Sequence, residues 1–154
     1  MPSTIETFYT AFKNQDAEAM VACYHKDIRF EDPAFGVLNG DRASNMWRML
    51  ISSQKGKDFN VSFSNITCDN NSGTAHWEAI YTFSQTGRKV HNTIDAQFEL
   101  KDDKIIKHTD SFNLHTWAKQ AMGFKGMLLG GTGFFKKKLQ AQTNKLLDKY
   151  EGKQ

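Results

Sequence analysis

The sequence contains little cysteine: only Cys23 and Cys68 among 154 residues. The two lie far apart, without the close spacing of a redox or zinc motif. The histidines likewise show no spacing with Asp or Glu that indicates a specific metal site. Stable disulfides are typical of secreted proteins, and this sequence has no disulfide framework. We therefore expect two reduced thiols, no metal and a cytoplasmic location.

Long apolar runs are also missing. No stretch reaches about 18 residues, the length that indicates a membrane-spanning helix. The N-terminal residues MPSTIETFYT lack the basic flank and apolar run of a signal peptide. The net charge is only +3, and its excess lies near the C-terminus. We expect neither a nucleic-acid partner nor stable membrane association.

What is present is the composition of a soluble globular chain, with 39% hydrophobic and 24% charged residues. At 154 residues the chain has the length of one domain. Such a chain is large enough for a core and an internal pocket.

Helical periodicity marks the N-terminal part. Ser3 and Glu6 form a capping box before a first helix. Asp16 is placed to cap a second helix, and a third is predicted over 41–54. Each helix carries one apolar stripe: Ile5, Phe8, Tyr9 and Phe12 in the first, Met20, Cys23 and Tyr24 in the second, and Met46, Trp47, Leu50 and Ile51 in the third.

Alternation with a period of two follows, which predicts strands. A short strand over 28–32 is stopped by Pro33, and 34–40 is predicted to be a loop. Longer strands are predicted over 59–68, 74–84, 88–100 and 104–114. The pattern indicates an α+β fold in which a curved antiparallel sheet wraps around three N-terminal helices. We expect a ligand pocket between the two layers, because one helix layer cannot fill a strongly curved sheet.

The stretch 104–114, KIIKHTDSFNL, decides how we interpret this pocket. Its alternate positions Ile106, His108, Asp110, Phe112 and Leu114 fall on one face of a strand. A solvent-facing row would not need large apolar residues. A core row would not accept an unpaired carboxylate, because burying one is costly. A cavity lined by polar groups satisfies both conditions.

Three segments resemble a known family: FYTAFKNQDAEAMVACYHKDIRFEDP, the Gly87-Arg88 pair at a predicted hairpin, and KIIKHTDSF. They are similar to SnoaL-like and ketosteroid-isomerase-like proteins of the nuclear transport factor two superfamily. The resemblance covers roughly 3–117 and implies a SnoaL-like domain over 1–117. It also implies a cone-shaped α+β barrel that is often a homodimer through its outer sheet face. Activities in the family run from isomerisation and polyketide ring closure to epoxide hydrolysis, and many members lack known catalysis.

Only some of the functional residues of the family have a counterpart in this sequence. Asp32 matches the proton-shuttling aspartate of ketosteroid isomerases. Asp110 matches the acid/base aspartate of SnoaL-like cyclases and a catalytic aspartate of limonene-epoxide-hydrolase-like enzymes. The isomerase's helical tyrosine falls near Phe8 or Tyr9, but its neutral strand aspartic acid falls at Ala96. This departure argues against steroid isomerisation, and the arginine between two aspartates that epoxide hydrolases require is not evident.

Asp110, His108 and Asp32 are therefore the candidate catalytic residues, with Asp110 as general base. The alternative for Asp110 and His108 is a buried pair that only fixes the strand register. The alternative for Asp32 is a turn residue that accepts backbone amides. The candidate substrate-binding residues share inward positions, although such aromatic residues also build ordinary cores: Asn92, Trp47, Trp77, Tyr81, Tyr9, Phe98 and Phe112.

Two functions remain open at this point. One is a cofactor-free isomerase, cyclase or hydrolase acting on a small hydrophobic carbonyl-containing or cyclic molecule. The other is a non-catalytic module that binds such a molecule in the same pocket. A dimeric scaffold whose pocket is closed by side chains is a weaker third option.

Residues 118–154 lie beyond the resemblance. They contain a glycine-rich connector, GFKGMLLGGTG, and an amphipathic helix that Thr132 would cap. This helix could pack on its own domain or on a dimer mate. It could instead act as a lid or touch a membrane surface, because Leu, Phe and Lys are mixed. We favour packing, because three lysines alone give weak lipid affinity.

Overall fold

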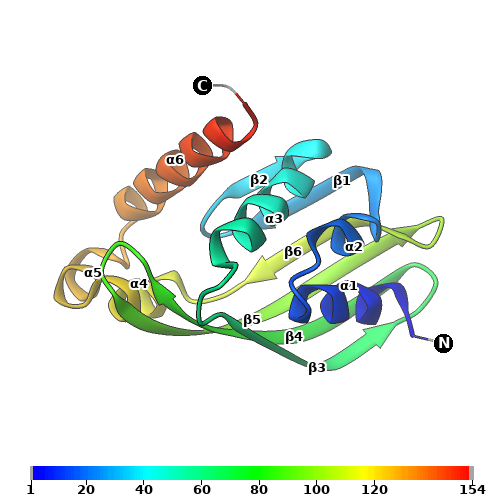
Figure 1. Ribbon diagram of the computed structural model, residues 1–154, viewed down its shortest axis with the longest axis horizontal. Helices are drawn as coiled ribbons and strands as arrows, with labels where there is room; N and C mark the ends of the chain where they lie inside the picture. Colours follow the sequence, from blue (N-terminus) through cyan, green and yellow to red (C-terminus); the bar gives the residue numbers. More distant parts are fainter. Residues whose placement is uncertain (1, 153–154) are drawn as a thin grey trace.

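The computed structural model describes residues 2–152 and shows the α+β architecture that the sequence predicts. Helices α1, α2 and α3 lie against one face of a curved sheet, and α4 and α5 gather at one end of the molecule (Figure 1). The elements, in chain order, are α1 (Thr4–Lys13), α2 (Ala17–Val21), β1 (Tyr24–Asp32), β2 (Gly36–Asn39), α3 (Asp41–Gln54), β3 (Asn60–Cys68), β4 (Ser72–Phe83), β5 (Arg88–Lys101), β6 (Lys104–Ser111), α4 (Leu114–Met122), α5 (Phe124–Leu129) and α6 (Gly133–Tyr150).

The strands form one curved, open sheet in the order β2-β1-β6-β5-β4-β3. Neighbouring strands are antiparallel, as expected, except that β1 runs parallel to β6. Parallel strands need a long crossover connection, which the rest of the domain supplies here. The pairing places Phe30 opposite His108 and Glu31 opposite Thr109. It therefore joins the two segments that carry the candidate carboxylates.

Two segments differ from the sequence prediction near this pair. Tyr24 begins strand β1 rather than ending the second helix, and residues 36–39 form β2 rather than a loop. Strand β2 pairs with β1 through a tight turn, and Gly36 adopts a φ of 77° there. Glycine occupies this left-handed conformation without the steric cost that a Cβ would add.

Strand β6 also departs from simple alternation. Ile105 is fully buried while Ile106 is partly exposed, because the β5–β6 register shifts at this point. Such a bulge reverses the side-chain alternation on one side of it. The strand then ends at Ser111, so Phe112 and Leu114 do not continue the row of His108 and Asp110.

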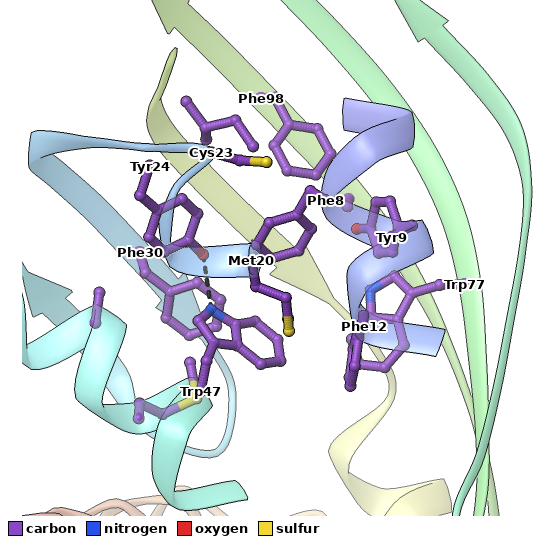
Figure 2. Close-up of a cluster of buried hydrophobic side chains, with 14 of the residues drawn as sticks. Phe8, Tyr9, Phe12, Met20, Cys23, Tyr24, Phe30, Trp47, Trp77 and Phe98 are labelled. Carbon is purple, nitrogen blue, oxygen red and sulfur yellow. Dashed lines mark hydrogen bonds between the residues drawn. The ribbon is translucent and has the colours of Figure 1, made fainter. Parts of the chain in front are cut away.

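The predicted helix caps are present. Ser3, Asp16 and Thr132 each accept a hydrogen bond from the backbone N–H three residues later, at 3.0–3.1 Å. The apolar stripes of α1 to α3 meet the inner face of the sheet in one core rich in aromatic rings. Figure 2 shows its largest members: Phe8, Tyr9, Phe12, Tyr24, Phe30, Trp47, Trp77 and Phe98.

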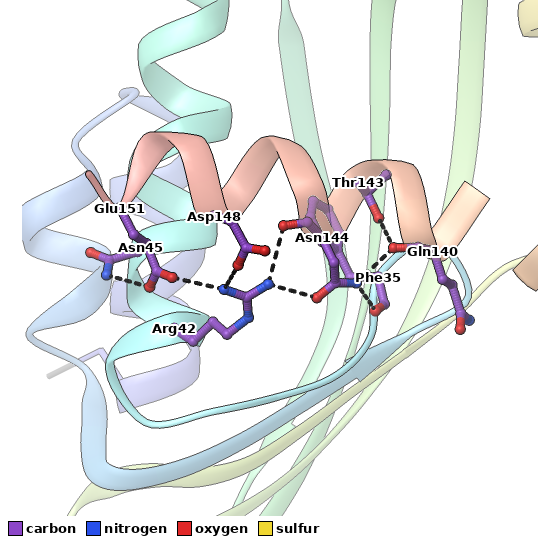
Figure 3. A network of polar contacts seen from close by, with 8 residues as sticks. All are labelled: Phe35, Arg42, Asn45, Gln140, Thr143, Asn144, Asp148 and Glu151. Atoms are coloured by element: carbon purple, nitrogen blue, oxygen red, sulfur yellow. Dashed lines mark hydrogen bonds and ion pairs between the residues drawn. The ribbon is translucent and has the colours of Figure 1, made fainter. Parts of the chain in front are cut away.

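Helix α6 docks on the domain mainly through polar contacts (Figure 3). Arg42 of α3 lies 2.7 Å from both Asp148 and Glu151 and 2.8 Å from the side chain of Asn144. Thr143 and Asn144 donate to backbone carbonyls of the β1–β2 turn. Within the described residues, Leu147 is the fully buried side chain of this helix. Arg42 is therefore the main polar anchor of α6, beside the buried Leu147.

We expect Arg42→Ala to loosen α6 selectively. Loss of four hydrogen bonds to three residues should lower the local stability of α6 by about 1–3 kcal/mol. Hydrogen exchange should show faster exchange of α6 amides and little change in β4 and β5. Arg29→Ala is the matched control, because Arg29 of β1 pairs with Glu31 and both side chains are 44% exposed. Equal exchange of α6 in both variants would contradict the role of Arg42.

Candidate functional site

His108 lies in the centre of the core with no exposed surface, and Asp110 is 4% exposed. Both rise from β6 on the inner face of the sheet. The two ring nitrogens of His108 are engaged, Nδ1 at 2.7 Å from Tyr24 Oη and Nε2 at 2.9 Å from Asp110 Oδ1. A buried histidine needs such partners, because an unpaired polar atom in the core costs free energy. The site therefore begins as a satisfied hydrogen-bond network.

The network continues at both ends. Trp47 Nε1–H donates to Tyr24 Oη at 2.8 Å, the contact drawn as a dashed line in Figure 2. Trp77 Nε1–H donates to Asp110 Oδ1 at 3.4 Å. Five side chains from β1, α3, β4 and β6 are thus linked in one chain of hydrogen bonds.

The hydrogen bond from Trp47 bears on which partner receives the proton of the Tyr24 hydroxyl. Tyr24 Oη accepts from Trp47, so its own proton is available for His108 Nδ1. In this arrangement the imidazole Nε2–H donates to Asp110 Oδ1. A protonated imidazole would instead donate from Nδ1 to Tyr24 Oη. Among residues 2–152, Asp110 Oδ2 has no hydrogen-bond partner, which leaves this oxygen available for another proton.

Aromatic rings enclose the imidazole. The ring centroids of Phe98, Phe30 and Phe8 lie 4.4, 5.0 and 5.5 Å from that of His108. Trp47 stacks nearly parallel to it, with an interplanar angle of 12°. These contacts exclude water, and electrostatic interactions between the polar groups inside are stronger for that reason.

Asp32 lies on the neighbouring strand. It follows Glu31, which pairs with Thr109, just as Asp110 follows Thr109 on β6. Its Oδ1 accepts backbone N–H groups of Ala34 and Phe35 at 2.9 and 2.6 Å. Burial, and then the charge of Asp110, raise the pKa of Asp32 to about 7, against these two hydrogen bonds. Asp32 is therefore both a turn residue and a carboxyl group able to exchange its proton near neutral pH.

Tyr9 contributes an unusual polar atom. Its side chain is fully buried, and its hydroxyl is the buried side-chain polar atom without a hydrogen bond in the described part of the chain. Burial, and then the charge of Asp110, raise the pKa of Tyr9 well above its ordinary value. A buried unsatisfied donor is rare in folded proteins. It is free to donate to an acceptor brought in from outside.

Comparison with known protein families identifies the domain that carries this site. The SnoaL-like domain matches residues 5–108, more than half of the chain. This chain belongs to the SnoaL-like family. Comparison with curated proteins finds no match. The family match begins in α1 and ends at His108, so α4 to α6 lie outside it.

Solved structures share the fold of this SnoaL-like protein. An LEH-like epoxide hydrolase from M. tuberculosis is 22% identical, with a TM-score of 0.58 over 82% of this chain and 88% of that one. A proposed polyketide cyclase from Xanthomonas campestris pv. campestris is 19% identical, with a TM-score of 0.60 over 76% and 93%. A protein of ketosteroid isomerase-like fold from Catenulispora acidiphila, bound to trimethylamine, is 11% identical, with a TM-score of 0.63 over 79% and 93%. At these identities the likeness concerns the fold.

Some of the remaining candidate residues of this SnoaL-like protein lie away from Asp110. Asn92 faces inward on β5 but lies four residues from Ala96, which pairs with Asp110. That spacing is about 13 Å along a strand, so the structure does not bring Asn92 to the carboxylate. Tyr81 instead accepts a hydrogen bond from Trp117 at 2.8 Å, in a second cluster that Phe112 also touches.

Tyr24 is the participant that the sequence alone did not single out. Periodicity assigned it to a helical stripe, whereas it begins β1. The usable signal was indirect: a buried His108 needs a partner for each ring nitrogen, and Asp110 supplies only one. Which residue supplies the other depends on the parallel β1–β6 pairing.

The predicted pocket next to Asp110 does not coincide with either of two surface hollows. One, of about 430 Å³, is lined by residues of β3, β4 and β5, including Phe98. The other, of about 570 Å³, lies at Pro2, Glu6, Thr7 and Thr10. Neither is lined by His108, Asp110 or Asp32. Across residues 2–152, no group of three or more His, Cys, Asp or Glu is arranged to hold a metal ion.

We expect Tyr24→Phe to destabilise the SnoaL-like domain by about 1–3 kcal/mol, because it leaves the Trp47 N–H and His108 Nδ1 buried without a partner. Urea unfolding measures this loss, and ¹⁵N shifts of His108 should show a changed tautomer balance. Tyr150→Phe is the control, since Tyr150 is 43% exposed, and it should change stability by less than about 0.5 kcal/mol. Equal stability of the two variants would show that the Tyr24 hydroxyl does not hold the imidazole.

Asp32 should make stability depend on pH. The folded protein keeps this proton up to about pH 7, whereas an unfolded aspartate loses it near pH 4. The folded state therefore binds more protons between these values, and the free energy of unfolding falls as pH rises, by at most about 1.4 kcal/mol per pH unit. Asp32→Asn should flatten this dependence in urea unfolding curves at several pH values. Asp103→Asn, at an exposed turn, should leave it as in the unmodified protein.

Proposed function

We propose that this SnoaL-like protein is a cofactor-free acid/base enzyme of the isomerase, cyclase or hydrolase kind. Its substrate would be a small hydrophobic carbonyl-containing or cyclic molecule. One observation carries the proposal: Asp110 and the unpaired hydroxyl of Tyr9 are buried in an apolar core, and the charge of Asp110 acts on both Tyr9 and the half-buried Asp32. Ionisable groups perturbed by burial and by one another are typical of catalytic sites.

In this proposal Asp110 is the general base. Its Oδ2 takes a proton from the carbon next to a carbonyl group, and the electron pair left behind forms an enolate. The Tyr9 hydroxyl donates a hydrogen bond to the enolate oxygen, where negative charge develops. The proton then returns to another carbon from Asp110 or from Asp32, which exchanges its proton near pH 7.

His108 supports the base through position and charge. Its neutral imidazole donates to Asp110 Oδ1 and is fixed from behind by Tyr24 and Trp47. This arrangement orients the carboxylate without itself losing or gaining a proton. Tyr9, rather than the candidate substrate-binding residue Asn92, is the oxyanion donor in this proposal, since the charge of Asp110 acts on Tyr9.

Substrate entry requires side chains to move, because rings fill the space around His108. Phe98 is common to the surface hollow of about 430 Å³ and to this aromatic cluster. We propose that displacement of its ring connects the two. The wall of the opened pocket would include Trp77, Tyr9 and Phe98, whose flat faces suit a cyclic molecule.

A non-catalytic binding module is the second candidate function. The observation that favours it is the complete pairing of His108, together with two hydrogen bonds on Asp110 Oδ1. A fully satisfied buried network makes a core rigid and specific without any chemistry. In that case the polar groups would only orient a bound molecule.

Hydrogen exchange at carbon separates the two functions. The protein in D₂O is mixed with a panel of cyclic and linear ketones, and NMR follows the loss of the protons next to the carbonyl. We expect accelerated exchange for at least one ketone, and a rate about 10²–10⁴-fold lower for Asp110→Asn. Asp103→Asn, at the exposed turn between β5 and β6, should exchange like the unmodified protein.

A ketone that raises the melting temperature of both the unmodified protein and Asp110→Asn, without exchange in either, would select the binding module. Exchange that is accelerated equally by Asp110→Asn would remove Asp110 as the base. The melting curves also verify that Asp110→Asn is folded.

We further propose a homodimer through the outer sheet face and action in the cytoplasm. The outer face carries His76, Glu78, His91 and Asp95 in mutual contact. Contact with Asp95 and Glu78 raises the pKa of His76. The free thiols Cys23 and Cys68 are in keeping with a reducing compartment, and no helix among residues 2–152 has the length and apolarity needed to cross a membrane.

A further inference from the structure

Helix α5 exposes all four of its large apolar side chains. Phe124 is 70% exposed, Leu128 61%, Leu129 51% and Met127 47%. Phe134, at the start of α6, is 73% exposed. Single exposed apolar residues are normal on a protein surface, but a contiguous group indicates an interaction site.

The docking of α5 on α4 turns these side chains outward. Gly126 is the buried residue of α5, and a Cβ at this position would collide with the carbonyl oxygen of Ala118. His115 Nε2 lies 2.8 Å from the carbonyl oxygen of Met127 and fixes the helix from the α4 side. The smallest residue therefore faces the protein, and the large apolar residues face away from it. A helix built for core packing would have the opposite arrangement.

The same part of the chain is strongly basic. Between Asp110 and Asp148 the sequence has no Asp or Glu, yet it contains six lysines: Lys119, Lys125, Lys136, Lys137, Lys138 and Lys145. Since the whole chain carries a net charge of +3, the remaining residues are net negative. Lys136, Lys137 and Lys138 are exposed on the first turns of α6, directly after Phe134. Positive charge and exposed apolar surface thus occur together.

This surface lies at one end of the molecule. Figure 1 shows α4, α5 and the beginning of α6 at the end of the long axis away from the N-terminus. The family match stops at His108, before all three helices. An extended flat partner can therefore approach α5 without meeting the helices α1 and α2.

We infer that the surface formed by Phe124, Met127, Leu128, Leu129 and Phe134, with the exposed Lys125, Lys136, Lys137 and Lys138 next to them in the chain, docks reversibly on an anionic lipid bilayer. Helices that lie in the membrane interface combine large apolar side chains on one side with Lys or Arg. Negatively charged headgroups complement the lysines, and the apolar side chains enter the acyl boundary. A second copy of the chain fits this surface less well, because a symmetric contact would bring two sets of lysines together.

The expected binding is weak and depends on salt. Each lysine near an anionic surface strengthens binding by roughly fivefold at low ionic strength. The effect falls off within a Debye length of about 10 Å at 0.1 M salt. This reversible contact is compatible with the absence of stable membrane association that the composition suggests, and it does not depend on the proposed chemistry.

Vesicle co-sedimentation of the full chain tests the inference. We expect binding to phosphatidylcholine vesicles that contain 30% phosphatidylserine, no binding to phosphatidylcholine alone, and loss of binding as salt is raised. Phe124→Ser with Leu128→Ser should abolish binding. Lys136→Glu, Lys137→Glu and Lys138→Glu together should weaken it by more than about 100-fold, because each change removes an attractive charge and adds a repulsive one.

Two matched variants keep the same chemistry away from α5. Val37→Ser with Ile80→Ser removes apolar side chains that are each 42% exposed elsewhere. Lys13→Glu, Lys26→Glu and Lys101→Glu together change the net charge equally, at exposed positions of α1, β1 and β5. Both should bind vesicles far better than the α5 and α6 variants. Melting temperatures check that every variant is folded. We expect all of them to fold, because the replaced side chains are exposed.

Three results would overturn the inference. They are no binding to anionic vesicles, equal binding to neutral vesicles, and equal loss of binding in the test and control variants. Analytical ultracentrifugation tests the competing explanation, in which two copies of the chain associate through this surface. If Phe124→Ser with Leu128→Ser dissociates an oligomer and vesicles are not bound, a second copy of the chain covers this surface. A dimer through the outer sheet face would survive that variant.

Discussion

The structure depends on the pairing of one buried imidazole. His108 lies where β1, β6 and α3 meet, and its two nitrogens join Tyr24 to Asp110. Without both partners, a ring nitrogen at the centre of the aromatic core would stay unpaired, at a cost of about 1–3 kcal/mol. The network therefore selects one register for β1 on β6, and it does so with residues far apart in sequence. The same contacts that hold the fold also hold the candidate base.

This double role explains why a structural and a catalytic interpretation fit the same atoms. Asp110 is oriented through Oδ1, while Oδ2 is left without a partner in the described chain. Tyr9 has a hydroxyl that the fold does not use. Such an unsatisfied donor lowers stability. A group of this kind persists most readily where it meets a ligand, so Tyr9 is the clearest sign that the interior does more than support the sheet.

The C-terminal helices add two surfaces of different chemistry to the SnoaL-like core. Helix α6 lies over α3 and the β1–β2 turn through the Arg42 network, close to the turn that Asp32 stabilises. Helix α5 makes close backbone contact with α4 and presents its apolar side chains outward. Helix α6 thus packs on the domain through polar contacts, whereas helix α5 presents an exposed apolar surface to the solvent.

Local pattern determined the elements of this protein. Alternation predicted the inward rows of β4 and β5, capping residues predicted the starts of α1 and α6, and the position of His108 and Asp110 on the inner face followed from a period of two. Only the tertiary structure decided that β1 is parallel to β6, that a bulge buries Ile105 in place of Ile106, and that Tyr24 completes the histidine's hydrogen bonds. Periodicity reports which side of an element is apolar, whereas strand partners, register and filled volume arise from contacts between residues distant along the chain.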